Sequence, residues 1–249
     1  MLKIERQNFI LNKIYTEGKV LISSLSNDLE VSEDTIRRDL IELDQKNQLK
    51  RVRSGAIRIG PSITDFSYRE NKDIPTKKEI AKKVIPNLKQ NTTIMVDGSS
   101  SNLELIKLLP ENFMATIITN CPPIIIELAN KTNIKVISIG GEFYKRSQVN
   151  LGVSAYKQIK KIYADYYLMG VYNIDSQYGC SVPTQEEADI KEVMSQQSDK
   201  VLCLVTNDKF ETISSFFHQD IHGISTIFTD NVATNIKKSY EDSGVTIVQ

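Results

Sequence analysis

The sequence predicts an α/β protein in which a winged helix-turn-helix precedes a larger domain built on a mainly parallel sheet. Two patterns predict this fold class. Residues 1–60 combine short amphipathic helices with a basic hairpin, whereas residues 76–249 alternate apolar strands with helical segments. Such alternation is typical of a parallel sheet that helices cover on both faces. Residues 61–75, between the two domains, are mostly polar and are interpreted as a connector.

The N-terminal domain is predicted to begin with two helices. The first runs from Ile4 to Glu17, and Gly18 follows it as the residue that commonly ends a helix. A short strand is expected over 20–22, and a second helix is expected from Ser23, its N-cap, to Leu29.

The segment that starts at Ser32 is interpreted as a DNA-recognition helix. Ser32 is a favourable N-cap residue, and apolar residues then recur at i, i+4 and i+7 on one face. Thr35, Arg37 and Arg38 fall off that apolar stripe. We expect Ser32 and these three polar residues to enter or border the major groove of DNA.

A basic hairpin follows the recognition helix. Its strands are expected over 49–53 and 56–59, joined by Ser54-Gly55, a pair suited to a two-residue turn. In that register Arg51 lies opposite Arg58 and beside Arg53, although like charges directly opposite one another are unfavourable in an isolated sheet. A polyanion lying across this face would remove the penalty. We therefore expect these three arginines to contact DNA phosphates.

The second domain is predicted to contain seven strands. They are expected over 93–97, 115–119, 135–139, 166–170, 201–206, 226–229 and 245–248. Helices are expected over 76–90, 103–109, 122–131, 153–162, 185–198 and 232–243. Several of the strands are continuous apolar runs, as strands buried on both faces of a sheet are.

Polar and glycine residues follow several of the predicted strands. Residues 98–101 follow the first strand at a helix start, where backbone amides and hydroxyls can wrap a phosphate. Gly140-Gly141 and Lys209 follow two other strands, and Glu187 and Lys191 lie one turn apart on a helix. Because ligands of open α/β sheets bind beyond the carboxyl ends of the strands, these residues predict a ligand site. Each signal also has a structural interpretation, as a plain turn or a solvated ion pair.

Composition limits the classes of function. The 249-residue chain has a formal net charge of zero, but residues 36–60 hold seven basic and three acidic residues. A basic module on a balanced chain is typical of regulators that also house a ligand domain. Three cysteines argue against a disulfide framework, and His218 and His222 lack the further ligands of a metal site, so no metal or cofactor is expected. Without a long apolar run or a signal-peptide core, the protein is predicted to be cytoplasmic.

Together these motifs resemble the DeoR family of bacterial transcription regulators, also called the GlpR type, over essentially the whole chain. The most specific match is the run from Val31 to Leu40, which is similar to the family's Val-Ser-x-x-Thr-Ile-Arg-Arg-Asp-Leu. The resemblance implies a regulator and not an enzyme, acting mostly as a repressor on operator DNA as a homodimer or homotetramer. It further implies a sensor domain similar to ribose-5-phosphate isomerase that binds a phosphorylated sugar.

The resemblance also implies a set of effector-binding residues. Residues 97–101 lie where the family usually has Asp-Ser-Gly-Thr-Thr, with the second and third residues in swapped order. The implied set is Asp97, Gly98, Ser99, Ser100, Ser101, Thr119, Asn120, Gly140, Gly141, Glu187, Lys191 and Lys209. The chain departs from the family at Arg53, where a His is usual, and at Thr206, where an Asp is usual.

Two other interpretations remain open. An isomerase-like enzyme would use Asp97, Glu187 and Lys209 as a base and an anion clamp. A DNA-binding protein whose α/β domain only oligomerises would show no stabilisation by ligands. In a regulator, the connector and the helix over 76–90 are the predicted route by which ligand binding reaches the DNA-binding domain.

Overall fold

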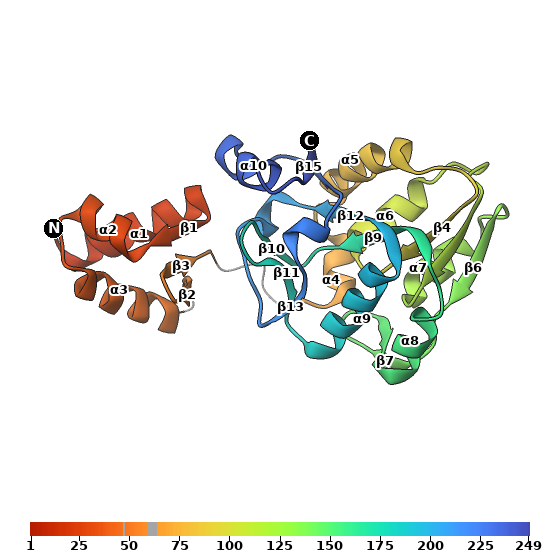
Figure 1. Cartoon of the computed structure of the whole chain (residues 1–249), viewed down its shortest axis with the longest axis horizontal. Helices are drawn as coiled ribbons and strands as arrows, with labels where there is room; N and C mark the ends of the chain where they lie inside the picture. Colours follow the sequence, from red (N-terminus) through yellow and green to blue (C-terminus); the bar gives the residue numbers. More distant parts are fainter. Residues whose placement is uncertain (47, 59–63) are drawn as a thin grey trace.

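A computed structural model describes residues 1–46, 48–58 and 64–249, which form two domains (Figure 1). A small helical domain with a hairpin lies at the N-terminal end, and a larger domain with helices on both faces of a sheet contains the rest (Figure 1). The predicted winged helix-turn-helix and mainly parallel α/β domain are therefore confirmed. Within the described part of the chain, no helix is both long and apolar enough to cross a membrane.

The winged-helix domain has a three-stranded antiparallel sheet beside its helices, with the strand order β1-β3-β2. Its elements are α1 (Lys3–Glu17), β1 (Lys19–Leu21), α2 (Ile22–Leu29), α3 (Glu33–Gln45), β2 (Lys50–Val52) and β3 (Gly55–Ile57). Ile10, Leu25 and Leu40 are fully buried at the centre of the domain. Each of the three helices thus contributes apolar side chains to the core that holds the domain together.

Local sequence explains two of the helix ends and corrects a third. Gly18 ends α1 with a φ of 79°, a conformation that favours glycine. Ser32 caps α3, because its side chain accepts a hydrogen bond from the backbone N–H of Thr35. The prediction of Ser23 as the cap of α2 is wrong, since the helix begins one residue earlier, where Ile22 is buried.

The hairpin has a different register from the predicted one. Gly55 belongs to β3 and pairs with Val52, so the turn consists of residues 53–54. Arg51 lies opposite Ala56, and the predicted pairing of Arg51 with Arg58 is wrong. The reason lies across the sheet, where a Cβ at position 55 would be 1.8 Å from a backbone oxygen of β1. Only a glycine allows the two strands to approach so closely.

The segment predicted to be a connector contains a helix. The predicted hairpin end at Ile59, the domain boundary at Gly60 and the first connector residues, 61–63, lie outside the described residues. After them, α4 covers Phe66–Asn71. Phe66 is fully buried in the core of the larger domain, so the prediction of a plain connector is wrong for this stretch. Burial of one aromatic side chain anchors a helix that is otherwise polar.

The larger domain is built on a seven-stranded parallel sheet with the order β15-β14-β12-β9-β4-β5-β6. Its strands are β4 (Thr92–Val96), β5 (Ala115–Thr119), β6 (Ile134–Ser138), β9 (Ala164–Gly170), β12 (Ser198–Val205), β14 (Thr226–Thr229) and β15 (Thr246–Val248). All seven correspond to predicted strands. Met95, Tyr167 and Cys203, at the centre of the sheet, are fully buried.

Helices and two small sheets complete the larger domain. The helices are α4, α5 (Ile74–Val84), α6 (Ser100–Leu108), α7 (Pro122–Leu128), α8 (Gly152–Ile159), α9 (Gln185–Gln196) and α10 (Thr234–Glu241), with 3-10 turns η1 (Ile85–Asn87), η2 (Asn207–Lys209) and η3 (Ile221–Gly223). The small antiparallel sheets, which were not predicted, pair β7 (Glu142–Tyr144) with β8 (Val149–Leu151), and β10 (Asn173–Asp175) with β11 (Gly179–Val182) and β13 (Phe216–Gln219). The helix predicted over 76–90 corresponds to α5, which ends earlier, at Val84. It stops there because Pro86, in the η1 turn that follows, has no backbone N–H to donate.

The strand order changes direction between β4 and β9. From β4 the sheet continues through β5 to β6 on one side, whereas β9, β12, β14 and β15 build the other side. Ligands of open α/β sheets bind at such a switch point, in the crevice beyond the carboxyl ends of the strands. The fold therefore directs attention to the residues that follow Val96 of β4 and Gly170 of β9.

Candidate functional site

The carboxylate of Asp97, at the end of β4, joins the elements around the switch point. It accepts hydrogen bonds from the Tyr167 hydroxyl at 2.6 Å, the Gly170 backbone N–H at 2.9 Å and the Asn102 amide at 3.0 Å. It also forms an ion pair with Lys191 of α9. Asp97 is only 3% exposed, so this predicted effector residue lies beneath the site and holds it together.

The turn after β4 packs against the end of β9. Ser99 caps α6, because its hydroxyl accepts a hydrogen bond from the backbone N–H of Asn102 at 3.0 Å. A Cβ at Gly170 would lie 2.1 Å from the Cβ of Ser99, so the close approach of the two segments requires glycine there. A Cβ at Gly98 would lie 2.1 Å from a methyl group of Val149. The swapped order of these two residues thus places the capping serine at the helix start and the glycine against β8.

A cavity opens above this turn and adjoins a larger one of about 280 Å³. Six of the predicted effector residues line the first cavity, namely Gly98, Ser99, Ser100, Glu187, Lys191 and Lys209. Five residues line both cavities, and Ser100, Arg69 and Lys209 are among them, with Thr64 and Tyr172. The helix N-terminus of α6 and two cations therefore face one continuous space, which is an arrangement suited to an anion.

Five other predicted effector residues line neither of these cavities: Ser101, Thr119, Asn120, Gly140 and Gly141. Thr119 and Asn120 are buried and hold local backbone, the first accepting from the Cys121 N–H at 3.1 Å and the second donating to the Asn150 carbonyl at 3.0 Å. The glycine pair follows β6, at the sheet edge two strands away from β4. These five residues therefore lie outside the walls of the two cavities.

Arg69, on α4, is the site residue that sequence reasoning missed. Its guanidinium lies over the ring of Phe66, with 5.8 Å between the guanidinium carbon and the ring centroid. Among the described residues, its buried Nε and Nη2 atoms have no hydrogen-bond partner. Burial lowers the pKa of Arg69, although a guanidinium remains charged at neutral pH. The only signal in the sequence was Phe66, one helical turn earlier in a polar segment.

Lys209 supplies the second cation at the boundary of the two cavities. It ends the η2 turn that follows β12 and is half-buried. Burial lowers its pKa to about 8, opposed by Asp208 and assisted by the neighbouring charge of Arg69. Thr206, where the family has an Asp, lines the larger cavity and donates to the Asp208 carboxylate at 2.6 Å. The amine is thus a cation that titrates close to neutral pH.

Glu187 and Lys191 do not form the solvated pair that their spacing also allowed. Lys191 is bound to Asp97 and donates to the Gly170 carbonyl oxygen at 2.7 Å. Glu187 accepts a hydrogen bond from the Thr184 hydroxyl at 2.9 Å. Both side chains line the first cavity, so α9 contributes one paired cation and one carboxylate to its wall.

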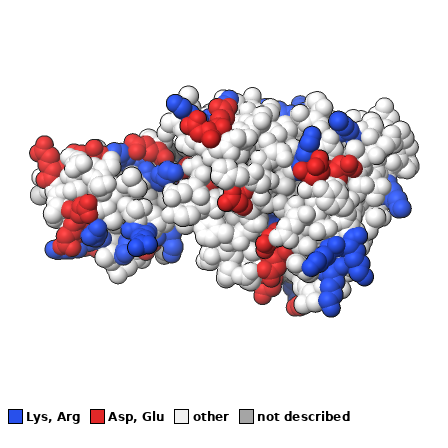
Figure 2. Space-filling model, in the orientation of Figure 1, with Lys and Arg blue, Asp and Glu red and all other residues white. Residues whose placement is uncertain are grey.

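The exposed face of α3 carries two of the predicted DNA-reading side chains. Arg37 and Arg38 are 56% and 75% exposed and pair with Glu33 and Asp34, one turn earlier. Exposed pairs of this kind contribute about 0–1 kcal/mol, so DNA can replace them at little cost. Figure 2 shows Lys and Arg side chains gathered along the edge of this domain that α3 and the hairpin form.

The three hairpin arginines do not share one face. Arg51 and Arg53 are exposed, and Arg53 lies in the turn itself. Arg58 lies instead at the junction of the two domains. Its backbone N–H donates to the Gly18 carbonyl at 2.8 Å, and its guanidinium donates to the Asn207 carbonyl of the larger domain at 3.3 Å. Arg51 and Arg53 are therefore exposed, as contact with DNA phosphates requires, although neither has the predicted position in the hairpin.

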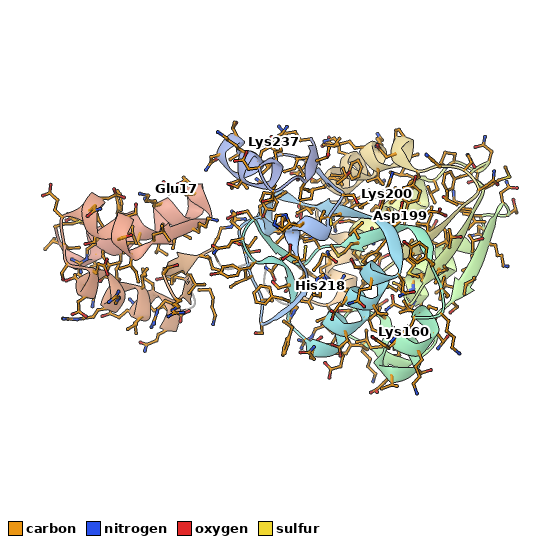
Figure 3. The ribbon with its side chains drawn as sticks, in the orientation of Figure 1. Glu17, Lys160, Asp199, Lys200, His218 and Lys237 are labelled. Carbon is orange, nitrogen blue, oxygen red and sulfur yellow. The ribbon has the colours of Figure 1, made fainter. Side chains whose placement is uncertain are left out.

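The two histidines do not form a chelating pair. His218 is buried on β13, which packs against α9, and burial lowers its pKa well below the ordinary value (Figure 3). His222 is exposed on η3, with its Nδ1 atom 3.1 Å from the Ser243 carbonyl oxygen. Within the described ranges, no group of three or more His, Cys, Asp or Glu side chains is arranged to hold a metal ion.

Comparison with known proteins identifies the family. A model described as the DeoR C terminal sensor domain matches residues 72–231, and one described as a DeoR-like helix-turn-helix domain matches residues 6–61. The chain belongs to the DeoR family. It is 30% identical to the HTH-type transcriptional regulator GolR of Listeria innocua over 99% of this chain and 98% of that protein. Membership confirms the prediction of a DNA-binding transcription regulator in place of an enzyme.

The chain is also similar to a second transcription regulator and to a solved structure. The L-fucose operon activator of Haemophilus influenzae is 27% identical over 98% of both chains. Among solved structures, ribose 5 phosphate isomerase A from Neisseria gonorrhoeae aligns with a TM-score of 0.41 at 14% identity, over 55% of this chain and 53% of that chain.

Asp97 connects β9, α6 and α9, so its replacement should lower the stability of the protein. We expect Asp97→Asn to lower the free energy of unfolding by about 3–5 kcal/mol, because Lys191 then remains buried without its counter-charge. Denaturant unfolding measures the loss. Asp208→Asn is the matched control, since Asp208 is exposed and the expected change is within about 0.5 kcal/mol. Equal stability of the two variants would contradict the role assigned to Asp97.

Proposed function

We propose that this DeoR-family protein is a repressor of sugar-metabolism genes whose DNA binding is controlled by a phosphorylated sugar bound at the switch point. The observation that carries the proposal is the cavity wall shared by Ser100, Arg69 and Lys209. A helix N-terminus, a guanidinium whose Nε and Nη2 atoms have no hydrogen-bond partner among the described residues, and a partly buried amine converge there. These groups are the ones that bind a phosphate dianion.

The phosphate is proposed to lie against the start of α6. There the backbone amides of residues 100 and 101 and the Ser100 hydroxyl donate hydrogen bonds, and Lys209 supplies charge. Arg69 presents two adjacent donors that can grip two phosphate oxygens at once. The sugar then extends into the adjoining cavity, where Thr206 and Asp208 offer oxygens to its hydroxyl groups.

DNA recognition is proposed for the exposed face of the winged helix. Ser32, Thr35, Arg37 and Arg38 would enter or border the major groove, and Arg51 and Arg53 would contact phosphates. Arg58 is left out of this set because it contacts the larger domain. The protein would act in the cytoplasm as a homodimer or homotetramer that reads half-sites about one helical turn apart.

The hydrogen bonds of Asp97 and Glu187 argue against the enzyme alternative. A catalytic base needs an oxygen within reach of the substrate, but both carboxylate oxygens of Asp97 are occupied by donors beneath the cavity. Glu187 lines the cavity and is engaged by Thr184. The alternative in which the α/β domain only oligomerises is separated from our proposal by ligand binding.

A thermal-shift screen tests the proposal, using ribose 5-phosphate, glucose 6-phosphate and fructose 6-phosphate with the free sugars as controls. A ligand at about 100 times its dissociation constant adds roughly 2.7 kcal/mol, which raises the melting temperature by several degrees. We expect at least one sugar phosphate to do so while its free sugar does not. A screen of phosphorylated sugars without any shift would favour the oligomerisation-only alternative.

The same binding is expected to depend on pH. Because the pKa of Lys209 is about 8, the amine is mostly protonated at pH 7 and mostly neutral at pH 9. An anion favours the protonated form, so its affinity is highest near pH 7, where the phosphate is also mostly a dianion, and falls by up to about tenfold per unit above pH 8. Lys209→Arg, whose side chain does not titrate in this range, should bind with little change between pH 7 and pH 9. A wild-type affinity that stays constant over this range would remove Lys209 from the site.

DNA reading by α3 predicts that Arg38→Ala weakens binding to the DNA sequence that the wild type selects from a random pool. We expect a loss of about 1–3 kcal/mol, because a guanidinium contact to a base edge is lost. Binding to random DNA should change far less. Titrations of both DNAs measure the two affinities. Lys13→Ala is the control, because it removes a basic side chain that pairs with Asp28 within the same domain. Equal losses on both DNAs would reassign Arg38 to the phosphate backbone.

A further inference from the structure

One short segment of the larger domain contacts the winged helix through an ion pair. Lys19, the first residue of β1, has its Nζ atom 3.4 Å from a carboxylate oxygen of Glu211 and donates to the Ser176 hydroxyl at 3.1 Å. Glu211 is only 2% exposed and also accepts from the Ser176 backbone N–H at 3.2 Å. Burial and Asp175 raise the pKa of Glu211, whereas Lys19 opposes this rise. The ammonium of the DNA-binding domain therefore favours the charged form of this buried carboxylate.

The same segment packs against the winged helix at two more points. A Cβ at Gly18 would lie 2.2 Å from the Cβ of Glu211, so the end of α1 sits directly on that residue. Arg58, at the end of the hairpin, donates to the Asn207 carbonyl at 3.3 Å and forms a parallel bridge with Thr212. Figure 3 shows Glu17, the last residue of α1, in the small domain next to this junction. Residues 207–212 thus hold the start of β1 and the residue after β3, which lie side by side in the sheet.

This segment also forms part of the cavity wall. Asp208 and Lys209 line the adjoining cavity, and Lys209 lines both cavities. Phe210 is the single residue between Lys209 and Glu211, and it is 1% exposed, with its ring edge-on to Tyr240 at 5.4 Å between centroids. Because Phe210 is packed on all sides, a displacement of Lys209 cannot be absorbed there and is passed along the chain.

Glu211 has a backbone conformation that depends on its surroundings. Its φ is +53°, in the left-handed region that a non-glycine residue adopts at a cost of about 1–2 kcal/mol. Such a conformation persists only where contacts fix it, and here they come from Lys19, Ser176 and the close approach of Gly18. We therefore expect the preferred backbone conformation of Glu211 to change when the winged-helix contacts are lost or when Lys209 shifts.

We propose that residues 207–212 couple the two sites, with Glu211 as the positioning residue that transmits occupancy at Lys209 to the winged helix through Lys19. This inference rests on the proposed function, because it assumes that an anion binds at Lys209. A ligand controls DNA binding only by favouring one conformation over another, and this segment of six residues touches both the cavity and the winged-helix domain. It provides a shorter route than the predicted one through the connector and α5.

The test measures how far a ligand changes DNA affinity. The probe is the sugar phosphate that shifts the melting temperature of the wild type most, and the DNA is the sequence that the wild type selects from a random pool. The ratio of DNA dissociation constants with and without the sugar phosphate is determined for the wild type, Lys19→Gln, Glu211→Gln and the double variant. Lys13→Gln is the matched control, because it removes a similar ion pair, with Asp28, that lies inside the winged-helix domain.

We expect a ratio of roughly 5 to 150 for the wild type and the control. Each variant of the pair should lower the ratio toward one, and the double variant should equal the singles, because both changes break the same link. The thermal shift caused by the sugar phosphate should remain in all of them. A wild-type ratio retained by Lys19→Gln, whose partly exposed side chain lies outside the hydrophobic core, would overturn the inference. A wild type that shows neither a thermal shift nor a ratio different from one would instead overturn the proposed function.

Discussion

A single buried carboxylate, that of Asp97, sets the geometry on which the site depends. Its partners come from β9, α6 and α9, so the two halves of the sheet and two covering helices meet at one charge. A buried carboxylate is stable only when its donors are all in place, which makes the arrangement nearly all-or-none. The turn that bears Ser99 and Ser100 is therefore also held in place. It starts at Asp97, and the Ser99 hydroxyl accepts a hydrogen bond from the backbone N–H of Asn102 in the first turn of α6.

The cavity above this joint has the opposite electrostatic character. Arg69 and Lys209 are partly withdrawn from water, and burial lowers the pKa of both. A desolvated cation without a full set of partners is costly to the protein alone, and an arriving anion removes that cost. Asp97 and the cavity residues thus have different roles. The fully hydrogen-bonded carboxylate of Asp97 fixes the geometry of the site, whereas Arg69 and Lys209, which lack a full set of partners among the described residues, attract an anion. Since Lys209 and Glu211 are separated by one packed residue, the charge that attracts the ligand is also close to the domain junction.

The sequence predicted the architecture well because its signals were local. The strands of the sheet are continuous apolar runs, and Ser32 and Gly18 mark helix ends by their own chemistry. The errors concern relations between distant segments. Gly55 is a strand residue and not a turn residue because β1 passes within contact distance, and α4 forms because Phe66 is buried in a core formed by residues far along the chain.

The site could be predicted only as far as strand order could. Residues at the ends of β4, β9 and β12 share the switch point, whereas Gly140 and Gly141 follow an edge strand. No pattern in the sequence distinguishes these two cases, because the order of parallel strands is decided by packing. Arg69 was missed for the same reason, since its helix belongs to the core of the sensor domain through a side chain whose partners lie elsewhere.

The most direct test of this account is a crystal structure of the protein with the sugar phosphate that stabilises it most. The account predicts that the phosphate lies at the N-terminus of α6, within hydrogen-bond distance of Ser100, Arg69 and Lys209, with the sugar in the adjoining cavity. A phosphate bound away from α6, or one that leaves the guanidinium of Arg69 without a contact, would contradict it.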